Sequence, residues 1–298
     1  MKQNIVVVGS INMDLVVRAP RHPLPGETIL GSDFRTFPGG KGANQAVAAA
    51  RLGGDVTMIG RVGSDEFGDT LRGTLEKDNV DTSYVLRTEG VSSGVALITV
   101  SDAGQNNIVV VPGSNGKLSP ADIHGSREAI EGAQVVLLQL EIPLDTVEEA
   151  VRTAKQAGAT VILNPAPAQA LPADLLAQVD ILTPNESELS LLTGTDAVDF
   201  EEARRKLGMK SLIVTLGSNG VQVIEPRGTR HIAAHAVKAV DTTAAGDAFV
   251  GALAVALTQG MDLFEAAEWG NAAAAISVTR AGAQPSLPTR AEVEAILS

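Results

Sequence analysis

Short apolar runs alternate with longer segments of helical periodicity along most of the chain. Runs of two to four mostly β-branched residues, bounded by turn residues, are typical of strands that are buried on both faces of a sheet. The helical segments between them make successive strands parallel. The pattern therefore predicts an α/β fold with a mostly parallel central sheet flanked by helices. We expect its strands at residues 5–8, 56–59, 135–138, 161–163, 181–182, 212–214 and 221–224.

Capping residues mark several of the predicted helix ends. Ser119 stands before Pro120, which is a favourable cap followed by a proline at the first helical position. Asp145 and Glu148 have the spacing of a capping box. Gly260 follows a long apolar segment, where it predicts the end of that helix.

Two regions break the alternation of strands and helices. Residues 14–38 place prolines among alternating apolar residues, and residues 91–112 contain two apolar runs, 94–100 and 107–111. Such segments are typical of antiparallel strands, so we expect both regions to leave the main sheet as a small lid. A lid would exclude water from a phosphate site. Edge hairpins that do not close remain the alternative.

Length and charge narrow the choice of function. The length of 298 residues fits one large domain or two smaller ones, and we predict a single α/β domain over residues 1–298. The net charge is -12 at pH 7. An acidic chain without long basic runs is a poor match to nucleic acid. A free nucleotide remains compatible, because Mg²⁺ and backbone amides can neutralise its phosphates.

Composition favours a soluble cytoplasmic protein. The chain contains no cysteine, so disulfides and thiolate metal sites are excluded, and a reducing compartment fits. The longest apolar run, 248–257, is far shorter than the ~20 residues of a membrane span, and the run 5–8 is too short for a signal peptide. The four histidines lack the spacing of metal ligands.

The segment from Asp241 to Asp247 leads directly into an apolar helix. Its small residues Ala244, Ala245 and Gly246 let the first amides of the helix face one region, where the helix dipole adds roughly half a positive charge. An anion hole is the expected result. Asp247 at its edge could accept a proton from a hydroxyl that attacks a bound phosphate, which indicates phosphoryl transfer to an alcohol. The alternative is an acidic residue that only stabilises the helix start.

A second glycine-rich segment also precedes a helix. Gly40 permits a ligand to approach the backbone closely, while Lys41 and Asn44 supply a cation and an amide. The segment lacks the spacing of a Walker A loop, and the chain lacks a dinucleotide fingerprint after a strand. A plain turn remains the alternative.

Polar residues follow the first strand and the strand at 135–138. Asn12 and Asp14 lie two positions apart in an extended segment, so they point to one side and could hold vicinal hydroxyls. An Asx turn is the alternative. Glu141 occupies an equivalent position after its strand. Ligands of open parallel sheets bind at the carboxyl ends of the strands, where all three residues are expected.

Two further segments suit a nucleotide. Asn185 and Glu188 have the spacing of a helix cap, and they would equally suit a Mg²⁺ shell held through water. The turn from Thr215 to Gly220 lies between two apolar strands. It could be a plain hairpin turn, or its glycines and hydroxyls could contact phosphates.

Seven motifs occur in order along the chain. They are Gly9-Ser-Ile-Asn-x-Asp14, Gly39-Gly-Lys-Gly-Ala-Asn-Gln45, Asn164-Pro-Ala-Pro167, Asn185-x-x-Glu188, Thr215-Leu-Gly-Ser218, Asp241-Thr-x-Ala-Ala-Gly-Asp247 and Gly282-Ala-Gln-Pro-Ser286. Each alone is a weak or moderate signal, but together they cover essentially the whole chain. In this order they resemble the ribokinase branch of the PfkB family of sugar kinases.

The resemblance implies a ribokinase-like fold and the ATP-dependent phosphorylation of D-ribose at its 5-hydroxyl, which yields D-ribose 5-phosphate and ADP. It implies that Asp247 is the catalytic base beside the anion hole. Sugar contacts correspond to Asn12, Asp14, Gly40, Lys41, Asn44, Glu141 and Asp247. Nucleotide contacts correspond to Asn185, Glu188, Thr215, Gly217, Ser218, Gly220, Gly246 and Asn271, with Asn185 and Glu188 also linked to Mg²⁺.

The resemblance also implies a monovalent cation and a dimer. The cation, usually K⁺, would lie in a loop beside the anion hole. The corresponding positions are Asp241, Thr243, Ser277, Arg280, Gly282 and Ser286, several of which would contribute backbone carbonyls. The lid strands of the family often pair across a homodimer, which suits the two irregular regions.

Other functions remain open. A related kinase could use fructose, deoxyribose or a nucleoside, although Asn12, Asp14 and Glu141 suit a small sugar more than a nucleobase. A non-catalytic sugar-sensing relative would be expected to lack the base or the glycines, and both are present. A nicotinamide dehydrogenase lacks its glycine fingerprint here.

Overall fold

The computed structural model describes residues 4–195 and 199–298. Within these residues the main sheet has nine strands, and neighbouring strands pair in parallel except in the two pairings at one edge. Their order across the sheet is β13 (Gly228–Ile232), β12 (Val221–Glu225), β11 (Ser211–Thr215), β10 (Ile181–Leu182), β9 (Thr160–Leu163), β8 (Val135–Leu138), β1 (Asn4–Val8), β4 (Asp55–Gly63) and β5 (Asp81–Thr88). The predicted, mostly parallel sheet is confirmed.

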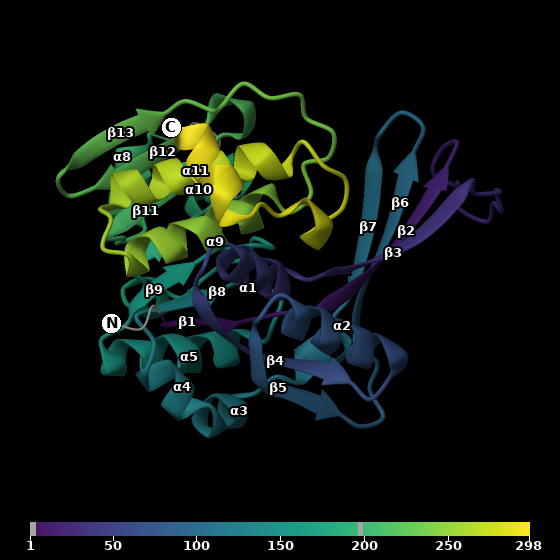
Figure 1. Cartoon of the computed structure of the whole chain (residues 1–298), viewed down its shortest axis with the longest axis horizontal. Helices are drawn as coiled ribbons and strands as arrows, with labels where there is room; N and C mark the ends of the chain where they lie inside the picture. Colours follow the sequence, from purple (N-terminus) through teal and green to yellow (C-terminus); the bar gives the residue numbers. More distant parts are fainter. Residues whose placement is uncertain (1–3, 196–198) are drawn as a thin grey trace.

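Helices cover both faces of the sheet (Figure 1). One face packs against α1 (Lys41–Arg51), α2 (Glu66–Lys77), α9 (Ala245–Thr258), α10 (Leu263–Ser277) and α11 (Arg290–Leu297). The other packs against α3 (Pro120–Gly125), α4 (Arg127–Glu131), α5 (Leu144–Ala157), α6 (Ala173–Leu176), α7 (Glu186–Thr193) and α8 (Phe200–Lys206). Short 3₁₀ turns are η1 (Gly113–Lys117), η2 (Gly217–Asn219) and η3 (Gln284–Ser286).

Strand β1 shows how the sequence specifies this layering. Ile5 and Val7 lie in one apolar core, and Val6 and Val8 lie in the other. Successive side chains of a strand point to opposite faces. A continuous apolar run therefore places the strand in the centre of a sheet that is covered on both sides.

The two irregular regions form a second sheet, which extends from the body as a lid (Figure 1). Its strand order is β3 (Asp33–Gly39), β2 (Asn12–Ala19), β6 (Gly94–Ser101) and β7 (Asn106–Val111). Each region supplies an antiparallel pair, as predicted. The two pairs join through β2 and β6, which are parallel.

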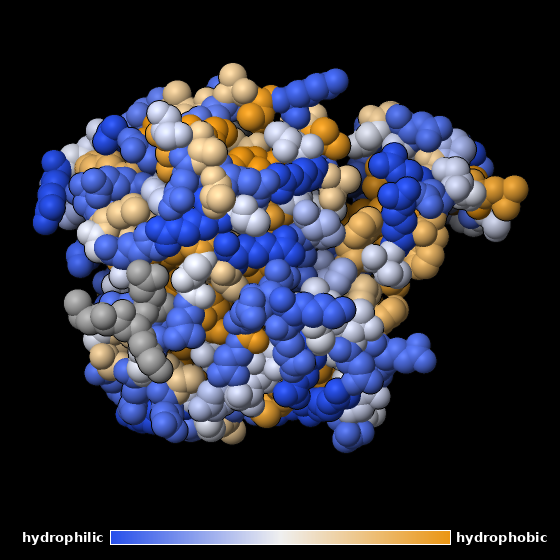
Figure 2. All heavy atoms as spheres, in the orientation of Figure 1, coloured by the Kyte–Doolittle hydropathy of each residue, from blue (hydrophilic) through white to orange (hydrophobic). Residues whose placement is uncertain are grey.

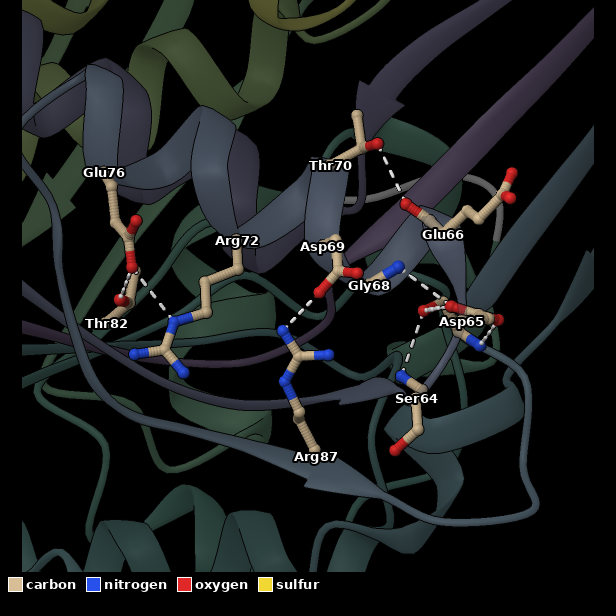
Figure 3. Close-up of polar contacts among 12 residues, drawn as sticks. Ser64, Asp65, Glu66, Gly68, Asp69, Thr70, Arg72, Glu76, Thr82 and Arg87 are labelled. Carbon is tan, nitrogen blue, oxygen red and sulfur yellow. Dashed lines mark hydrogen bonds and ion pairs between the residues drawn. The ribbon is translucent and has the colours of Figure 1, made fainter.

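Helix α2 is connected to the root of the lid through its cap. Asp65 accepts a hydrogen bond from the amide of Gly68 at 2.8 Å, so it caps α2 (Figure 3). The same carboxylate accepts the amide of Ser93 at 2.7 Å and the Ser93 hydroxyl at 2.6 Å, just before β6. Arg72 with Glu76 and Arg87 with Asp69 add surface ion pairs on α2 (Figure 3).

Two of the three predicted helix caps are confirmed. Ser119 forms a capping box at the start of α3, and Gly260 follows the end of α9 with a φ of 84°. The capping box predicted at Asp145 is wrong. Helix α5 begins at Leu144, two residues before the start that a cap at Asp145 implies, so Asp145 lies inside the first turn, where it accepts the amide of Thr146.

No helix among the described residues is both long and apolar enough to cross a membrane.

Candidate active site

The predicted site residues gather at the carboxyl ends of the parallel strands, beside the root of the lid. Residues 10–12 follow β1, Glu141 follows β8, and Asn164 follows β9. The starts of α1 and α9 face the same region, where Asn44 on α1 contacts Asp247 on α9. Because the carboxyl ends of parallel strands share one edge of a sheet, residues that are far apart in sequence become neighbours here.

Asp247 lies at the centre of the site. Its side chain is buried, with 6 % exposed. The Nδ2 of Asn44 donates to Oδ2 at 2.9 Å, and the Nε2 of Gln45 donates to Oδ1 at 3.0 Å. Each carboxylate oxygen is therefore held by one side-chain amide from the first turns of α1. Such a fixed carboxylate suits a general base, whose geometry must be set before proton transfer.

The backbone at the start of α9 leaves amides free. Ala244 caps the helix in the left-handed region, with a φ of 62°. The amide of Ala245 donates to the carbonyl of Thr242 at 3.3 Å, whereas the amides of Gly246 and Asp247 have no acceptor among the described residues. Free amides at a helix start can hold an anion.

One lysine lies among several carboxylates in this site. Burial disfavours the Lys41 ammonium, but attraction to Asp247, Glu141 and Glu188 outweighs it and raises the pKa of Lys41. Burial also raises the pKa of the Glu188 carboxyl, although Lys41 and the amide of Asn185 oppose this effect. The site thus keeps a charged lysine and excess negative charge, which suits bound cations.

Asp14 lies close enough to Glu141 and Asp247 to interact with both charges. Burial, followed by repulsion from Glu141 and from Asp247, raises the pKa of Asp14 to about 7. A Cβ at Gly39 would come within 2.4 Å of the Asp14 carboxylate, so this position must be small. The Asp14 carboxyl therefore changes charge near neutral pH, where its protonation alters how it can bind a hydroxyl.

Glu141 and Asn12 form a polar wall beside Asp14. Ser10 Oγ donates to Glu141 Oε2 at 2.5 Å, and the backbone amide of Lys41 donates to the same oxygen at 3.2 Å. Asn12 belongs to β2, not to an Asx turn, and its Oδ1 accepts from Asn115 Nδ2 at 2.6 Å. Gly40 has a φ of 88°, and a Cβ there would meet the amide of Asn12 at 2.7 Å. These contacts bring Asn12, Asp14 and Glu141 together beside the start of α1, and we call this group of polar residues the polar recess.

Two cavities meet at the start of α9. A polar cavity of about 190 Å³ is lined by Lys41, Glu188, Asp247 and Gly246, among others. A more apolar cavity of about 470 Å³ is lined by Phe249, Val278, Asn271, Gly246 and the turn from Thr215 to Gly220. Gly246 belongs to both, and a Cβ built on it would meet no atom within 4 Å. The larger cavity has the apolar walls and few polar groups typical of a nucleotide-sized site.

The residues predicted to contact the nucleotide lie in a helix cap, in a turn between two strands and on α10. Asn185 and Glu188 form a capping box at the start of α7, as one alternative predicted. The turn from Thr215 to Gly220 connects the antiparallel strands β11 and β12. Asn271 donates to the carbonyl of Ala233 at 2.8 Å, so its side chain positions the loop over the cavity.

The predicted cation loop is partly assembled. Asp241 Oδ1 accepts from the amide of Thr243 at 2.9 Å, and Oδ2 accepts from the amide of Gly282 at 2.9 Å, which joins two distant loops. Ser277 and Ser286 are buried and bond to nearby carbonyls. The side chain of Arg280 pairs with Glu292 on α11, so its guanidinium is directed to that helix.

Two places could hold a metal ion: the surroundings of Glu188 and the loops that contain Asp241 and Gly282. Across residues 4–195 and 199–298 there is no group of three or more His, Cys, Asp or Glu side chains arranged for a metal ion. Mg²⁺ in phosphate sites is commonly held by one or two carboxylates, waters and substrate phosphates, and the half-buried Glu188 fits that role. Backbone carbonyls of the Asp241 and Gly282 loops are suitable donors for a monovalent cation.

Sequence reasoning missed a group of uncharged residues beside Asp247. Gln45, Gln139 and Asn164 are buried and bonded to one another. Gln45 and Asn164 lie within motifs noted from the sequence, but only the charged or glycine neighbours there indicated chemistry. A polar amide within the apolar run before Glu141 was the available signal for Gln139.

Comparison with known proteins agrees with this geometry. The model for the pfkB family of carbohydrate kinases matches residues 2–290. A ribokinase of Haemophilus influenzae is 43% identical over 298 residues, which cover 98% of this chain and 97% of that protein. A deoxyribokinase of Salmonella typhimurium is 39% identical, with 99% of each chain covered.

A solved structure gives the same fold. The structure of Arabidopsis thaliana ribokinase complexed with ribose and ATP has a TM-score of 0.93 and 36% identity, and the match covers 100% of this chain and 99% of that one. Fold, motif order and family model agree along nearly the whole length, and this chain accordingly belongs to the pfkB family of carbohydrate kinases.

Proposed function

We propose that this chain transfers the γ-phosphoryl group of ATP to the 5-hydroxyl of D-ribose, giving D-ribose 5-phosphate and ADP. One observation carries the proposal. Asp247 is fixed by two side-chain amides and lies beside helix-start amides that have no acceptor among the described residues, where a polar cavity meets a nucleotide-sized one. The ribokinases among its relatives support ribose as the acceptor.

The polar recess would hold the sugar. Asp14 and Asn12 on β2 and Glu141 after β8 would bind ribose hydroxyls, while Lys41 and Asn44 would contact the sugar from α1. Gly40 leaves room for it, because a side chain there would collide with the backbone of Asn12. In this pose the 5-hydroxyl would point toward Asp247.

Phosphoryl transfer would follow from these positions. Asp247 accepts the proton of the 5-hydroxyl, the sugar oxygen bonds to the γ-phosphorus, and the bond to the bridging oxygen of ADP breaks. The free amides of Gly246 and Asp247, with that of Ala244, would stabilise the charge on the transferred group. These contacts would be strongest in the transition state, and only interactions of this kind accelerate the chemical step.

ATP would occupy the larger cavity. Its base would lie between Phe249, Val278 and Asn271, and its phosphates would extend past Gly217 and Ser218 to the start of α9. Thr215, Gly220 and Asn185 would complete the phosphate contacts. Mg²⁺, when bound near Glu188 and Asn185 through water, would neutralise phosphate charge.

We also propose a monovalent cation and a homodimer. K⁺ would bind between the loops that Asp241 joins, and its positive charge would add to the attraction of the anion hole for phosphate. The dimer would use the lid face opposite Asp14. The strand register places Val17, Phe34, Leu97 and Val109 on that face, each at least 36% exposed. Figure 2 shows apolar atoms gathered on the lid.

We propose the cytoplasm as the site of the reaction, which the lack of cysteine fits. The net charge of -12 supports small-molecule partners and not nucleic acid.

The deoxyribokinase relative makes 2-deoxyribose a second candidate acceptor. The test is ADP release from ATP with ribose, 2-deoxyribose, fructose and adenosine, each with Mg²⁺ and with K⁺ or Na⁺. The proposal expects the highest kcat/KM on ribose and a higher rate with K⁺. A preference for 2-deoxyribose would show that this sugar, and not ribose, is the acceptor. No turnover on any of the four would contradict a kinase function.

A further inference from the structure

We propose that Gln139 positions the catalytic base through Gln45, so that two buried amides in series fix which oxygen of Asp247 faces the sugar. The inference rests on the proposed function, because it assigns a role in that reaction to residues that do not touch the substrates. Gln45 and Gln139 are both fully buried.

The contacts form a chain across two elements. Gln139 Nε2 donates to Gln45 Oε1 at 2.6 Å, and Gln45 Nε2 donates to Asp247 Oδ1 at 3.0 Å. Gln45 Nε2 also approaches Asn164 Oδ1 at 3.4 Å. Asn164 Nδ2 is fixed in turn by the carbonyl of Thr183 at 2.8 Å.

Chemistry dictates the direction of every amide in this chain. An ionised carboxylate can only accept hydrogen bonds, so the atom of Gln45 next to Asp247 must be Nε2. Its Oε1 then points to the neighbouring amide, which must donate, and this requires Nε2 of Gln139. Turning either amide around would place two acceptors in contact inside a buried site, which is costly.

The glycine directly after β1 leaves space for Gln139. A Cβ at Gly9 would lie 2.0 Å from Gln139 Oε1, so a side chain at this position would displace the amide. Gln139 Oε1 itself has no partner among the described residues. A buried amide kept with one oxygen unpaired is costly for stability alone, which indicates that its donor is needed.

The consequence is a base with two assigned oxygens. Gln45 holds Oδ1, and Oδ2, which also accepts from Asn44, faces the recess. Lys41 from α1, Glu188 from α7 and Asp14 from β2 are the charged groups facing Asp247. None of them sets the orientation of Oδ1, which leaves the amide chain to do so.

The experiment compares Gln45→Leu, Gln139→Leu, the double variant and the wild type. Gln45→Leu is expected to lower kcat about ten- to a hundredfold, the range for losing a hydrogen bond to a charged group. Gln139→Leu removes a bond between neutral amides and is expected to lower kcat about two- to tenfold, with KM for ribose within about threefold in both variants. The acidic limb of the kcat profile should move upward by about one pH unit. The double variant should be no slower than Gln45→Leu, because Gln139 acts through Gln45.

A matched control is Gln134→Leu. Gln134 lies at the opposite end of β8, and its Oε1 also has no partner among the described residues. It should retain wild-type kcat. Additive losses in the double variant, or an unshifted pH profile in Gln139→Leu, would overturn the inference.

A second measurement separates this inference from the proposed function. If the wild type does not phosphorylate ribose, the proposed function fails, but crystal structures of the ligand-free variants still test the amide chain. The inference expects the contact of Asp247 Oδ1 with Gln45 to open in Gln139→Leu. An unchanged contact and carboxylate orientation would overturn it.

Discussion

Asp247 is the residue on which the proposed reaction depends most. Replacing it by Asn removes the proton acceptor while keeping the size of the side chain. We expect Asp247→Asn to lose ~10²–10⁴-fold in kcat while it keeps the fold and the ribose affinity, as measured by steady-state assays and calorimetric binding. Thermal unfolding should show a lower melting temperature, because the new amide nitrogen would face a donor from Asn44 or Gln45. Asp102→Asn, at an exposed lid turn, is the control and should behave as wild type. Near wild-type turnover of Asp247→Asn would refute the assignment of the base.

Asp14 gives a pH dependence of stability. Its pKa is about 7 in the folded protein, against 3.8 for an aspartate carboxyl free in water. Between these values the folded protein binds an extra proton, so its free energy of unfolding falls as pH rises and the loss is complete above pH 7. The asparagine of Asp14→Asn has no titratable carboxyl, so this pH dependence is absent from the variant.

We therefore expect the ligand-free Asp14→Asn variant to gain stability over the wild type as pH rises. The gain from pH 5 to pH 8 should be roughly 2 to 3 kcal/mol, measured by urea unfolding at both values. Asp102→Asn should show no such pH-dependent gain. A constant difference between Asp14→Asn and wild type at the two pH values would show that Asp14 does not titrate in this range.

Single residues were predicted from sequence where their chemistry is visible there. Asp14, Lys41, Glu141 and Asp247 carry charge, and all four come together around one recess. Gln139 was not predicted, because a neutral amide in an apolar run has neither a charge nor a motif that would indicate a function. Its partners are fixed only when β8 lies beside α1.

The start of α9 is the element on which the anion hole depends. Gly246 separates two cavities and leaves its amide free. Gly246→Val would project a branched side chain into that space, and we expect a loss of at least ~10²-fold in kcat and weaker ATP binding by calorimetry. Gly73→Val is a matched control on α2, where a Cβ also meets no atom within 4 Å. Full activity of Gly246→Val would contradict the anion hole.

The buried strands were predicted well, and the two edge strands were not. The ends of the predicted strands agree with the structure within a few residues. β5 and β13 were missed because an edge strand lies partly in solvent and lacks a continuous apolar run. The capping box at Asp145 failed for a local reason, since the helix begins at Leu144 and the acidic residue then falls inside the first turn.

The lid is the element that would hold two copies together. Val109 is 61% exposed on the lid face opposite Asp14, beside Leu97. If this face forms the dimer, Val109→Glu should convert it to a monomer, as measured by light scattering after size exclusion. The control is Leu191→Glu, which changes an apolar residue that is 53% exposed on α7. It should leave the assembly intact. A dimer that survives Val109→Glu would place the interface elsewhere.

At the scale of the whole molecule, topology explains how residues spread over nearly 240 positions form one site. Parallel strands from four parts of the chain end at the same edge, and the starts of α1 and α9 face that edge. The alternation of strands and helices predicted this arrangement from the sequence. The division of residues 1–298 into a single domain with an internal lid remains a prediction.

Transfer of phosphate to the 5-oxygen of ribose is the reaction that the proposed function requires. It is tested most directly by ³¹P NMR of the product formed by the wild type from ATP and D-ribose with Mg²⁺ and K⁺. One new phosphate ester is expected, with phosphorus coupled to the two protons of carbon 5, and ADP in equal amount. Phosphate on another carbon, or free phosphate without a sugar ester, would contradict it.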